Sequence, residues 1–212
     1  MNTLKILVTA GATREHIDPV RFISNPSTGV MGAAIAKAAK ERKHGVTFLA
    51  GAGCVDAPGI KKRINFESID ELKSLVLKHL RHHDVLIMTA AVGDYRPTVI
   101  NKHKMQRQKG MVLKLIQTPD ILKAASKKYP NKIIIGFCLE TSDLIHKAKQ
   151  KRIRKNCHAM VGCQLGSKKN PFGKNQLQAI LVDDSGNVIF KGYRSKSTIS
   201  RLVIRYAEKL SS

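Results

Sequence analysis

The chain has 212 residues, none of which is tryptophan, and only 5% of them are aromatic. Proteins that hold single-stranded nucleic acid stack its bases on aromatic side chains, so such a surface is poorly supplied here. The four cysteines form no C-x-x-C pair and no histidine lies at zinc-binding spacing from them, so we expect reduced thiols. No apolar run approaches the roughly 20 residues that a membrane span needs. A signal-peptide pattern is absent too, so we expect a cytoplasmic protein without a membrane partner.

Acidic residues are also scarce. The 15 Asp and Glu residues are set against 38 Lys and Arg, which gives a formal net charge of +23. A charge this far from zero predicts anionic partners, which are nucleic acid, phosphorylated metabolites or both. Because the basic residues are spread along the whole chain rather than held in one tail, solvated lysine faces without a partner are an equally simple interpretation.

Short apolar runs alternate with segments of helical periodicity. This alternation is typical of a parallel sheet covered on both faces, so we expect a Rossmann-like, three-layer α/β fold with a mostly parallel central sheet, in one domain over residues 1–212. Strands are expected at residues 5–11, 46–51, 62–66, 84–91, 132–138 and 159–162, followed by a loop over 164–175 and a hairpin of 177–182 and 188–190. Helices are expected over 28–43, after a capping box of Ser68 and Glu71, from 118 onward with Pro119 in the first turn, along 147–155, and around 199–210.

Two segments interrupt this alternation. Residues 12–22 mix ionisable and apolar side chains and are expected to form a loop beside the first strand. Residues 98–110 are very polar and cannot bury themselves, so they form either a solvated loop or a flap that orders over an anionic ligand. Because 111–116 alternates like a strand, we expect an inserted hairpin or flap at about 98–117.

The most informative stretch is residues 24–32, between the first strand and the first helix. A strand, a Gly/Ser/Thr-rich loop and a helix in this order direct free backbone N–H groups and the positive end of a helix at a ligand, which favours phosphate. Pro26 holds Asn25 in an extended conformation. The alternative is that Ser27 or Thr28 merely caps the helix. No G-x-G-x-x-G motif is present, so a nicotinamide-dependent reductase is a weaker hypothesis.

Three lysines of the helix along 147–155 share one face, because Lys147, Lys151 and Lys155 lie four residues apart. A row of like charges is repulsive unless water solvates it or an anion matches it. Both interpretations are open on the spacing alone.

Taken together, several motifs in order resemble phosphopantothenoylcysteine synthetase over nearly the whole chain. They are residues 8–15, 17–25, 27–29 with 31–32, 90–97, 119–122, 136–137 with 140–141, and 148–151 with Lys155. In bacteria this synthetase is often fused behind a flavin-dependent decarboxylase. That half is absent here, so the resemblance implies the stand-alone synthetase and no FMN.

The resemblance implies a ligase of coenzyme A synthesis. It would activate the carboxylate of 4′-phosphopantothenate with CTP, form an acyl-cytidylate, release pyrophosphate, and then give the amide and CMP when the amine of L-cysteine attacks. Lysines and Mg²⁺, the latter held largely by the triphosphate, would offset the repulsion between the two anions. Members of the family dimerise, so a homodimer is expected.

The resemblance also assigns roles to residues. Asn25 and Lys104 match the catalytic positions, with Lys104 needed to form the acyl-cytidylate and Asn25 holding it by its amide. Substrate would be bound by Asn25, Ser27, Thr28, Gly29, Ala90 and Ala91. CTP would be bound by Gly11, Asp94, Lys104, Pro119, Asp120, Ile121, Leu122, Phe137, Lys151 and Lys155.

The chain departs from the family pattern at a few positions. Gly162-Cys163-Gln164 replaces the usual small residue followed by Asn-Asp, and Val30 stands where a basic residue often follows the loop glycine. The runner-up hypothesis is a basic α/β module that binds nucleic acid without ligase activity, which its steep salt dependence would reveal.

Overall fold

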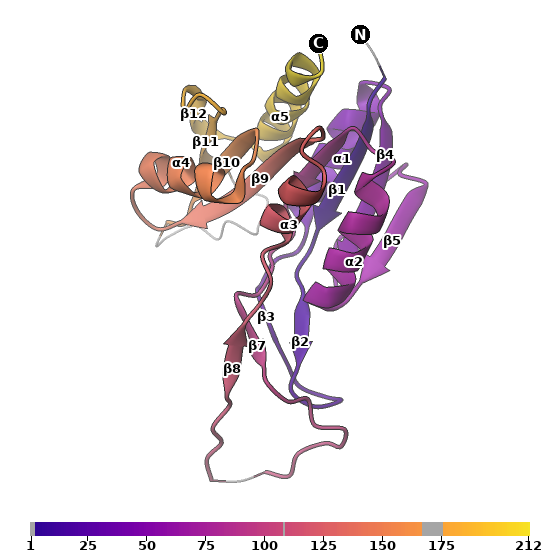
Figure 1. The fold of residues 1–212 in the computed structure, drawn as a ribbon, viewed down its shortest axis with the longest axis vertical. Coiled ribbons are helices and arrows are strands. Elements are labelled where there is room, and N and C mark those ends of the chain that lie inside the picture. The colour runs from indigo at the N-terminus through magenta and orange to yellow at the C-terminus, as the bar shows by residue number, and fades with distance from the viewer. Residues whose placement is uncertain (1–2, 108, 167–175) are drawn as a thin grey trace.

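The computed structural model describes residues 3–107, 109–166 and 176–212. Its core is an eight-stranded sheet in the order β12-β11-β10-β9-β6-β1-β4-β5, with helices on both faces (Figure 1). The six strands from β10 to β5 are parallel, and β11 and β12 add an antiparallel edge. The predicted three-layer, mostly parallel α/β fold is thus confirmed. The strands are β1 Lys5–Ala10, β4 Gly45–Gly51, β5 Lys62–Phe66, β6 Val85–Met88, β9 Ile133–Glu140, β10 Ala159–Gln164, β11 Leu177–Val182 and β12 Val188–Arg194.

The helices divide between two cores, one on each face of the sheet. α1 (Val30–Glu41) and α5 (Lys196–Leu210) pack on one face, whereas α2 (Ile69–Leu80), α3 (Ile121–Lys128) and α4 (Leu144–Lys155) pack on the other. Strand β1 supplies both cores by simple alternation, since Ile6 and Val8 belong to the α1–α5 side and Leu7 to the opposite side. All three side chains are fully buried.

The chain reverses direction across the sheet at β1. It proceeds from β1 through α1 to β4 and β5 on one side, and then returns to β6 and β9 on the other. At such a point in an open parallel sheet, the loops after two neighbouring strands run in opposite directions. A crevice therefore forms between them, outside the carboxyl ends of the strands. The fold therefore places a crevice beyond Ala10 and Met88.

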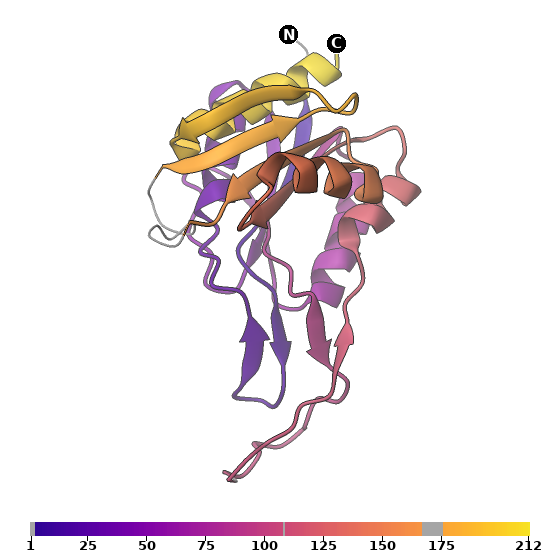
Figure 2. The same cartoon turned by 90° about the vertical axis from the view of Figure 1, so that its left-hand side faces the viewer.

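Two short hairpins extend from these carboxyl ends as an arm (Figures 1 and 2). β2 (Arg14–His16) pairs with β3 (Phe22–Ser24), so the loop expected over 12–22 is wrong in part and contains a strand. β7 (Tyr95–Pro97) pairs with β8 (Leu115–Gln117), and the chain between them is largely without regular structure. The predicted insertion is thus present, but the expected strand over 111–116 is wrong for residues 111–114. Among the described residues no strand pairs with them, although the Lys114 carbonyl accepts a hydrogen bond from the Thr98 N–H at 3.0 Å.

Several element ends differ from their expected positions. α3 is capped by the Asp120 carboxylate, which accepts a hydrogen bond from the Lys123 N–H at 3.1 Å, so Pro119 precedes the cap instead of standing in the first turn. Ser68 caps α2 as expected, whereas Glu71 accepts from the Glu67 N–H and not from that of Ser68. Gln164 is the last residue of β10, and the rest of the predicted loop lies mainly at 167–175, outside the described residues.

Two further observations concern the cysteines and the helices. Each of the four cysteines is a free thiol. Across the described ranges, none of the helices combines the length and apolarity that crossing a bilayer requires.

Candidate active site

A cleft of about 720 Å³ opens at the carboxyl ends of the central strands, at the crevice that the strand order creates. Its volume is in the range of small-molecule sites. The cleft brings together most of the residues that the resemblance singled out, although they come from five separate segments of the chain. They are Asn25, Ser27, Thr28, Gly29, Ala90, Ala91, Asp94, Pro119, Asp120, Ile121, Leu122, Phe137, Lys151 and Lys155.

The first wall of the cleft is the start of α1. Its N-cap is Gly29, at φ 75°, and no side chain caps the helix there, so the alternative in which Ser27 or Thr28 serves as the cap is wrong. A methyl group at Gly29 would overlap the Cys54 sulfur, and one at Gly32 would lie 2.5 Å from the Ala10 Cβ. The two glycines therefore let α1 begin directly against β1 and direct the positive end of the helix toward the cleft.

Asn25 bridges two walls of the site. Its Nδ2 donates a hydrogen bond to the Val92 carbonyl at 3.2 Å, and its own carbonyl accepts from the Ser27 N–H at 2.8 Å. Asn25 is exposed. An asparagine amide has two N–H donors and one carbonyl acceptor, so at the rim of a cleft it can also form hydrogen bonds with a bound carbonyl or amide group.

The segment after β6 is held to its neighbours by further hydrogen bonds. The Thr118 hydroxyl donates to the Gly93 carbonyl at 2.6 Å, and the Thr118 N–H donates to the Asp94 carbonyl at 3.0 Å. The Gly93 N–H in turn donates to the Thr13 hydroxyl at 3.2 Å. These contacts connect both hairpins of the arm to the floor of the cleft, so the loops that line it are fixed to one another.

The lysine row of α4 is matched by carboxylates of the protein. Lys151 Nζ lies 2.6 Å from Glu140 Oε1, Lys147 Nζ lies 3.6 Å from Glu140 Oε2, and Lys155 Nζ lies 3.0 Å from Asp120 Oδ2. The lysine spacing left solvation by water or pairing with a bound anion open, and neither interpretation included carboxylates of the protein itself. Lys151 and Lys155 line the cleft, so an anionic ligand there would share these two ammonium groups with Glu140 and Asp120.

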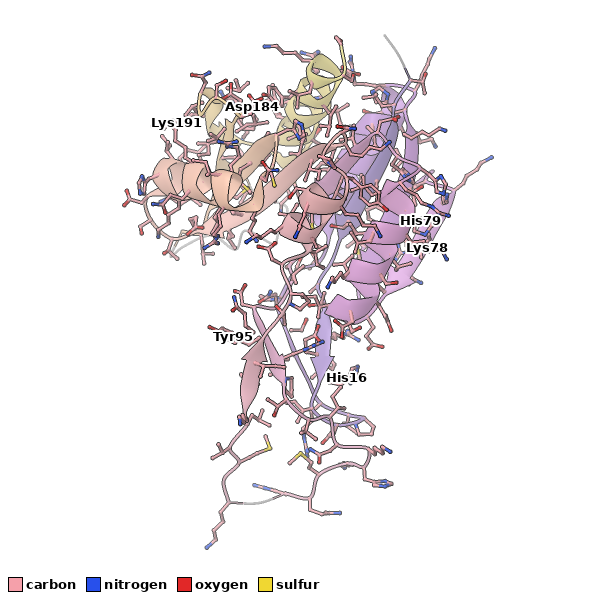
Figure 3. All side chains as sticks on the ribbon, in the orientation of Figure 1. His16, Lys78, His79, Tyr95, Asp184 and Lys191 are labelled. Carbon is pink, nitrogen blue, oxygen red and sulfur yellow. The ribbon has the colours of Figure 1, made fainter. Side chains whose placement is uncertain are left out.

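Two predicted residues lie outside the lining of the cleft. Gly11 has φ 83°, and its carbonyl accepts a hydrogen bond from the Ala91 N–H at 2.8 Å. This bond joins the segments that follow β1 and β6. Lys104 is exposed and belongs to the loop between β7 and β8. This loop forms the far end of the arm (Figures 1 and 2). Tyr95 and His16 mark the two hairpins of this arm, below the sheet (Figure 3).

The loop that carries Lys104 is tied to the β2–β3 turn. The Asp18 carboxylate accepts a hydrogen bond from the Met105 N–H at 3.2 Å, and Arg21 donates to the Met105 carbonyl from both terminal nitrogens, at 3.2 and 3.3 Å. Asp18 is fully buried and also pairs with Arg21 at 2.7 Å. Burial raises the pKa of Asp18, but the N–H groups of Val20, Arg21 and Met105 and the charge of Arg21 outweigh it and lower the pKa to about 2.

Lys196 and Cys163 also line the cleft, and the sequence interpretation missed both. One local signal was available for Lys196, because it follows the Ser195 cap and so occupies the first turn of α5, where a cation opposes the helix dipole.

Burial raises the pKa of the Cys163 thiol to about 12 and that of Cys138 to about 11. Both thiols are therefore protonated near neutral pH and are poor nucleophiles.

The described residues contain no group of three or more His, Cys, Asp or Glu side chains arranged to hold a metal ion. The cleft carboxylates Asp94 and Asp120 come singly, and Asp120 already accepts from Lys155 and from the cap of α3. This donor set fits a hard cation that arrives with most of its oxygen ligands on a bound phosphate chain, as Mg²⁺ commonly does.

Known proteins resemble this chain in both sequence and fold. The coenzyme A biosynthesis bifunctional protein CoaBC of Bacillus subtilis (strain 168) is 39% identical over 170 residues, which cover 79% of this chain and 42% of that protein. CoaBC of Escherichia coli (strain K12) is 32% identical over 215 residues, which cover 97% of this chain and 53% of that protein. This chain thus spans about half the length of these relatives.

A solved structure supports the same relationship. The crystal structure of the C-terminal domain of CoaBC superposes with a TM-score of 0.83 at 30% identity, covering 99% of this chain and 98% of that one. The family model described as DNA/pantothenate metabolism flavoprotein C-terminal domain matches residues 1–210. The chain therefore belongs to the family of the DNA/pantothenate metabolism flavoprotein C-terminal domain.

Proposed function

We propose that this protein is a ligase that joins 4′-phosphopantothenate to L-cysteine at the expense of CTP, as a step of coenzyme A biosynthesis. The observation that carries the proposal is the cleft at the strand ends, in which the N-terminus of α1, the Asn25 amide and the ammonium groups of Lys151 and Lys155 meet. Membership of the family supports it, as do relatives named for coenzyme A biosynthesis.

The reaction has two steps. First, an oxygen of the substrate carboxylate attacks the α-phosphorus of CTP, the bond to the β-phosphate oxygen breaks, and pyrophosphate leaves. Then the amine of L-cysteine attacks the acyl carbon, a C–N bond forms, the C–O bond to CMP breaks, and the amine loses a proton. The first step brings two anions together, so preorganised cations and N–H groups lower its barrier.

The cleft residues take up roles on its two sides. On the α1 side, Asn25 and residues 27–29 hold 4′-phosphopantothenate, including the acyl group that is formed from its carboxylate. On the α3–α4 side, Asp94, the 119–122 segment and Phe137 hold the nucleotide, and Lys151 and Lys155 neutralise its phosphates. Mg²⁺ enters with the triphosphate and supplies further charge neutralisation. The two steps need no FMN. We propose that they take place in the cytoplasm.

Lys104 completes the site only if its loop approaches a cleft. The arm that bears it also exposes large apolar side chains, which in monomeric proteins mark interaction surfaces. These are Val20, Phe22, Tyr95, Val99, Ile100, Met111, Val112, Leu115 and Ile116, all at least 41% exposed. We infer that the arms of two copies pack together in a homodimer and that the loop thereby reaches a cleft.

A direct assay tests the proposed reaction. The purified protein is supplied with 4′-phosphopantothenate, L-cysteine, CTP and Mg²⁺, and CMP and pyrophosphate are measured. We expect both products in equal amounts, and none when the substrate is omitted. Replacing CTP with ATP and UTP determines the nucleotide. Absence of both products with every nucleotide rejects the ligase.

Sedimentation analysis tests the dimer. Val112 is 97% exposed on the arm, so Val112→Asp changes little in an isolated chain and should yield monomers if the arms pair. Val188→Asp is the control, because that residue is exposed but lies on β12, the edge strand of the main sheet, and not on the arm. A wild-type monomer at micromolar concentration contradicts the dimer.

A further inference from the structure

Glu140 places a largely buried carboxylate behind the lysine row of α4. It is the last residue of β9, and its side chain is only 11% exposed. Its Oε1 lies 2.6 Å from Lys151 Nζ, and its Oε2 lies 3.6 Å from Lys147 Nζ. Of these three residues, Lys151 lines the cleft and the other two lie outside its lining. One carboxylate therefore has two ammonium groups beside it, and one of them belongs to the site.

Lys147 allows Lys151 to leave this carboxylate. A carboxylate with so little exposure is costly unless a cation stays beside it. Lys147 supplies that cation, and its ammonium group also donates a hydrogen bond to the Ser142 hydroxyl at 3.1 Å. Glu140 Oε1 receives no hydrogen bond of good geometry from the described part of the chain, so Lys151 is held beside it mainly by charge. Lys151 can therefore turn toward a bound anion without leaving Glu140 uncompensated.

The same contact limits how strongly Lys151 holds an anion. An ammonium group shared by a carboxylate and a phosphate attracts the phosphate less in total, because the two anions repel each other. The other cations that line the cleft are Lys123, Arg154, Lys155 and Lys196. Among the carboxylates, Asp94 and Asp120 line the cleft themselves, whereas Glu140 does not. The effect of Glu140 on a ligand therefore passes through Lys151.

We propose that Glu140 is a positioning residue that holds Lys151 at the cleft and weakens its binding of phosphate. This inference rests on the proposed ligase, in which Lys151 neutralises the phosphates of the nucleotide. Pyrophosphate is the product that carries those phosphates away from the site. Because Lys151 pairs with Glu140 again when pyrophosphate leaves, the carboxylate favours release of this product.

The first test removes the charge of Glu140 and keeps its shape. Binding of pyrophosphate with Mg²⁺ is measured by calorimetry for the wild type, for Glu140→Gln and for the matched control Asp143→Asn. Asp143 is an exposed carboxylate close to Glu140 in the chain and outside the lining of the cleft. We expect Glu140→Gln to lower the Kd about threefold or more and Asp143→Asn to match the wild type. An unchanged or raised Kd for Glu140→Gln overturns the inference.

The second test has the opposite sign, so damage to the fold cannot explain both results. In Lys147→Met, Glu140 depends on Lys151 alone, and the Kd of pyrophosphate should rise about threefold or more. Lys149→Met is the control for the loss of one positive charge, because Lys149 belongs to the same helix and lies outside the lining of the cleft. Equal effects of the two substitutions overturn the inference.

A double-mutant cycle shows whether Glu140 acts through Lys151. In a Lys151→Gln background, Glu140→Gln should change the Kd of pyrophosphate much less than it does in the wild type. An equal change in both backgrounds would mean that the carboxylate acts on the ligand directly, which overturns the positioning role. None of these measurements needs turnover. A protein that shows the expected Kd changes but makes no amide refutes the ligase alone, whereas an active ligase with unchanged Kd values refutes the role of Glu140 alone.

Discussion

The two carboxylate oxygens of Asp120 serve two different helices. Oδ1 accepts from the Lys123 N–H and caps α3, while Oδ2 lies 3.0 Å from Lys155 Nζ on α4. One side chain thus joins the start of α3 to the end of α4 at the rim of the cleft. Since the side chains of Asp120 and Lys155 are 34% and 23% exposed, the ion pair itself contributes only about 0–1 kcal/mol.

Asp120→Ala should therefore destabilise the protein more than Asp120→Asn does. Alanine loses the cap and the ion pair, whereas asparagine keeps an oxygen that caps α3. We expect a loss of about 1–2 kcal/mol for alanine and less than about 1 kcal/mol for asparagine, measured by urea unfolding. Equal losses for the two variants would contradict the division of roles.

Gly29→Ala should destabilise the start of α1 for two separable reasons. The backbone at φ 75° disfavours a side chain, and the new methyl group would overlap the Cys54 sulfur. Gly186 is the control, because it has φ 82° with open space around it. We expect Gly29→Ala to cost more than Gly186→Ala, by about 1 kcal/mol or more. In a Cys54→Ala background the difference should shrink, and an unchanged difference would count against the overlap.

Asp18 should make the arm sensitive to acid. Its pKa is lowered from the ordinary 3.8 to about 2, so its stabilising contacts are complete above pH 4 and are lost as the pH falls toward 2. Asp18→Asn removes this titration. The difference in unfolding midpoint between wild type and variant should therefore be largest near neutral pH and narrow between pH 4 and pH 2. A constant difference across that range would contradict the contacts.

The same variant should free the loop that carries Lys104. Without the Asp18 carboxylate, the Met105 N–H loses its acceptor and the Arg21 guanidinium loses its ion pair. We expect trypsin to cut Asp18→Asn faster than the wild type at Lys102, Lys104 or Arg107, with the fragments identified by mass spectrometry. Unchanged cleavage in this loop would show that other contacts hold it.

Asn25→Asp should affect the second step of the proposed reaction. The substitution replaces the Nδ2 donor with an oxygen, so the hydrogen bond to the Val92 carbonyl is lost and a negative charge enters the site. We expect pyrophosphate release on a single turnover to persist, while formation of the amide falls at least tenfold, about 1.4 kcal/mol in barrier height. Normal amide formation would remove the role assigned to Asn25.

Lys104→Gln should instead block the first step. Loss of the ammonium group removes a cation that offsets the charge of the two reactants, so pyrophosphate release should fall at least a hundredfold, about 2.7 kcal/mol. Lys102→Gln is the matched control, because Lys102 is exposed on the same loop and should retain activity. Equal effects of the two substitutions would indicate that only the total charge of the loop matters.

Short-range signals carried the prediction of the regular elements. The apolar run of β1, the Ser68 cap of α2 and the hairpin of β11 and β12 all appear where they were expected. Predictions that depend on strand pairing were less accurate. Among the described residues, no strand pairs with 111–114, and the loop expected over 12–22 contains β2, which pairs with residues 22–24.

The convergence of the cleft residues was predictable in outline, because the loops after parallel strands emerge at one edge of the sheet. The individual pairings were not. Glu140 at the end of β9 pairs with Lys151 within α4, and Asp120 at the start of α3 pairs with Lys155 at the end of α4. The sequence predicted an inserted hairpin or flap around Lys104, but no local pattern predicted that Lys104 lies outside the lining of the cleft.

The sequence by itself determined the alternation of strands and helices, the positive charge and the loop that opens α1, because each depends on residues close together in the chain. The tertiary structure alone decided that Lys196 is buried in the cleft wall and that Asp18 and Arg21 hold the loop of Lys104. Those arrangements depend on how segments some 80 residues apart pack, and packing is decided by the whole core at once.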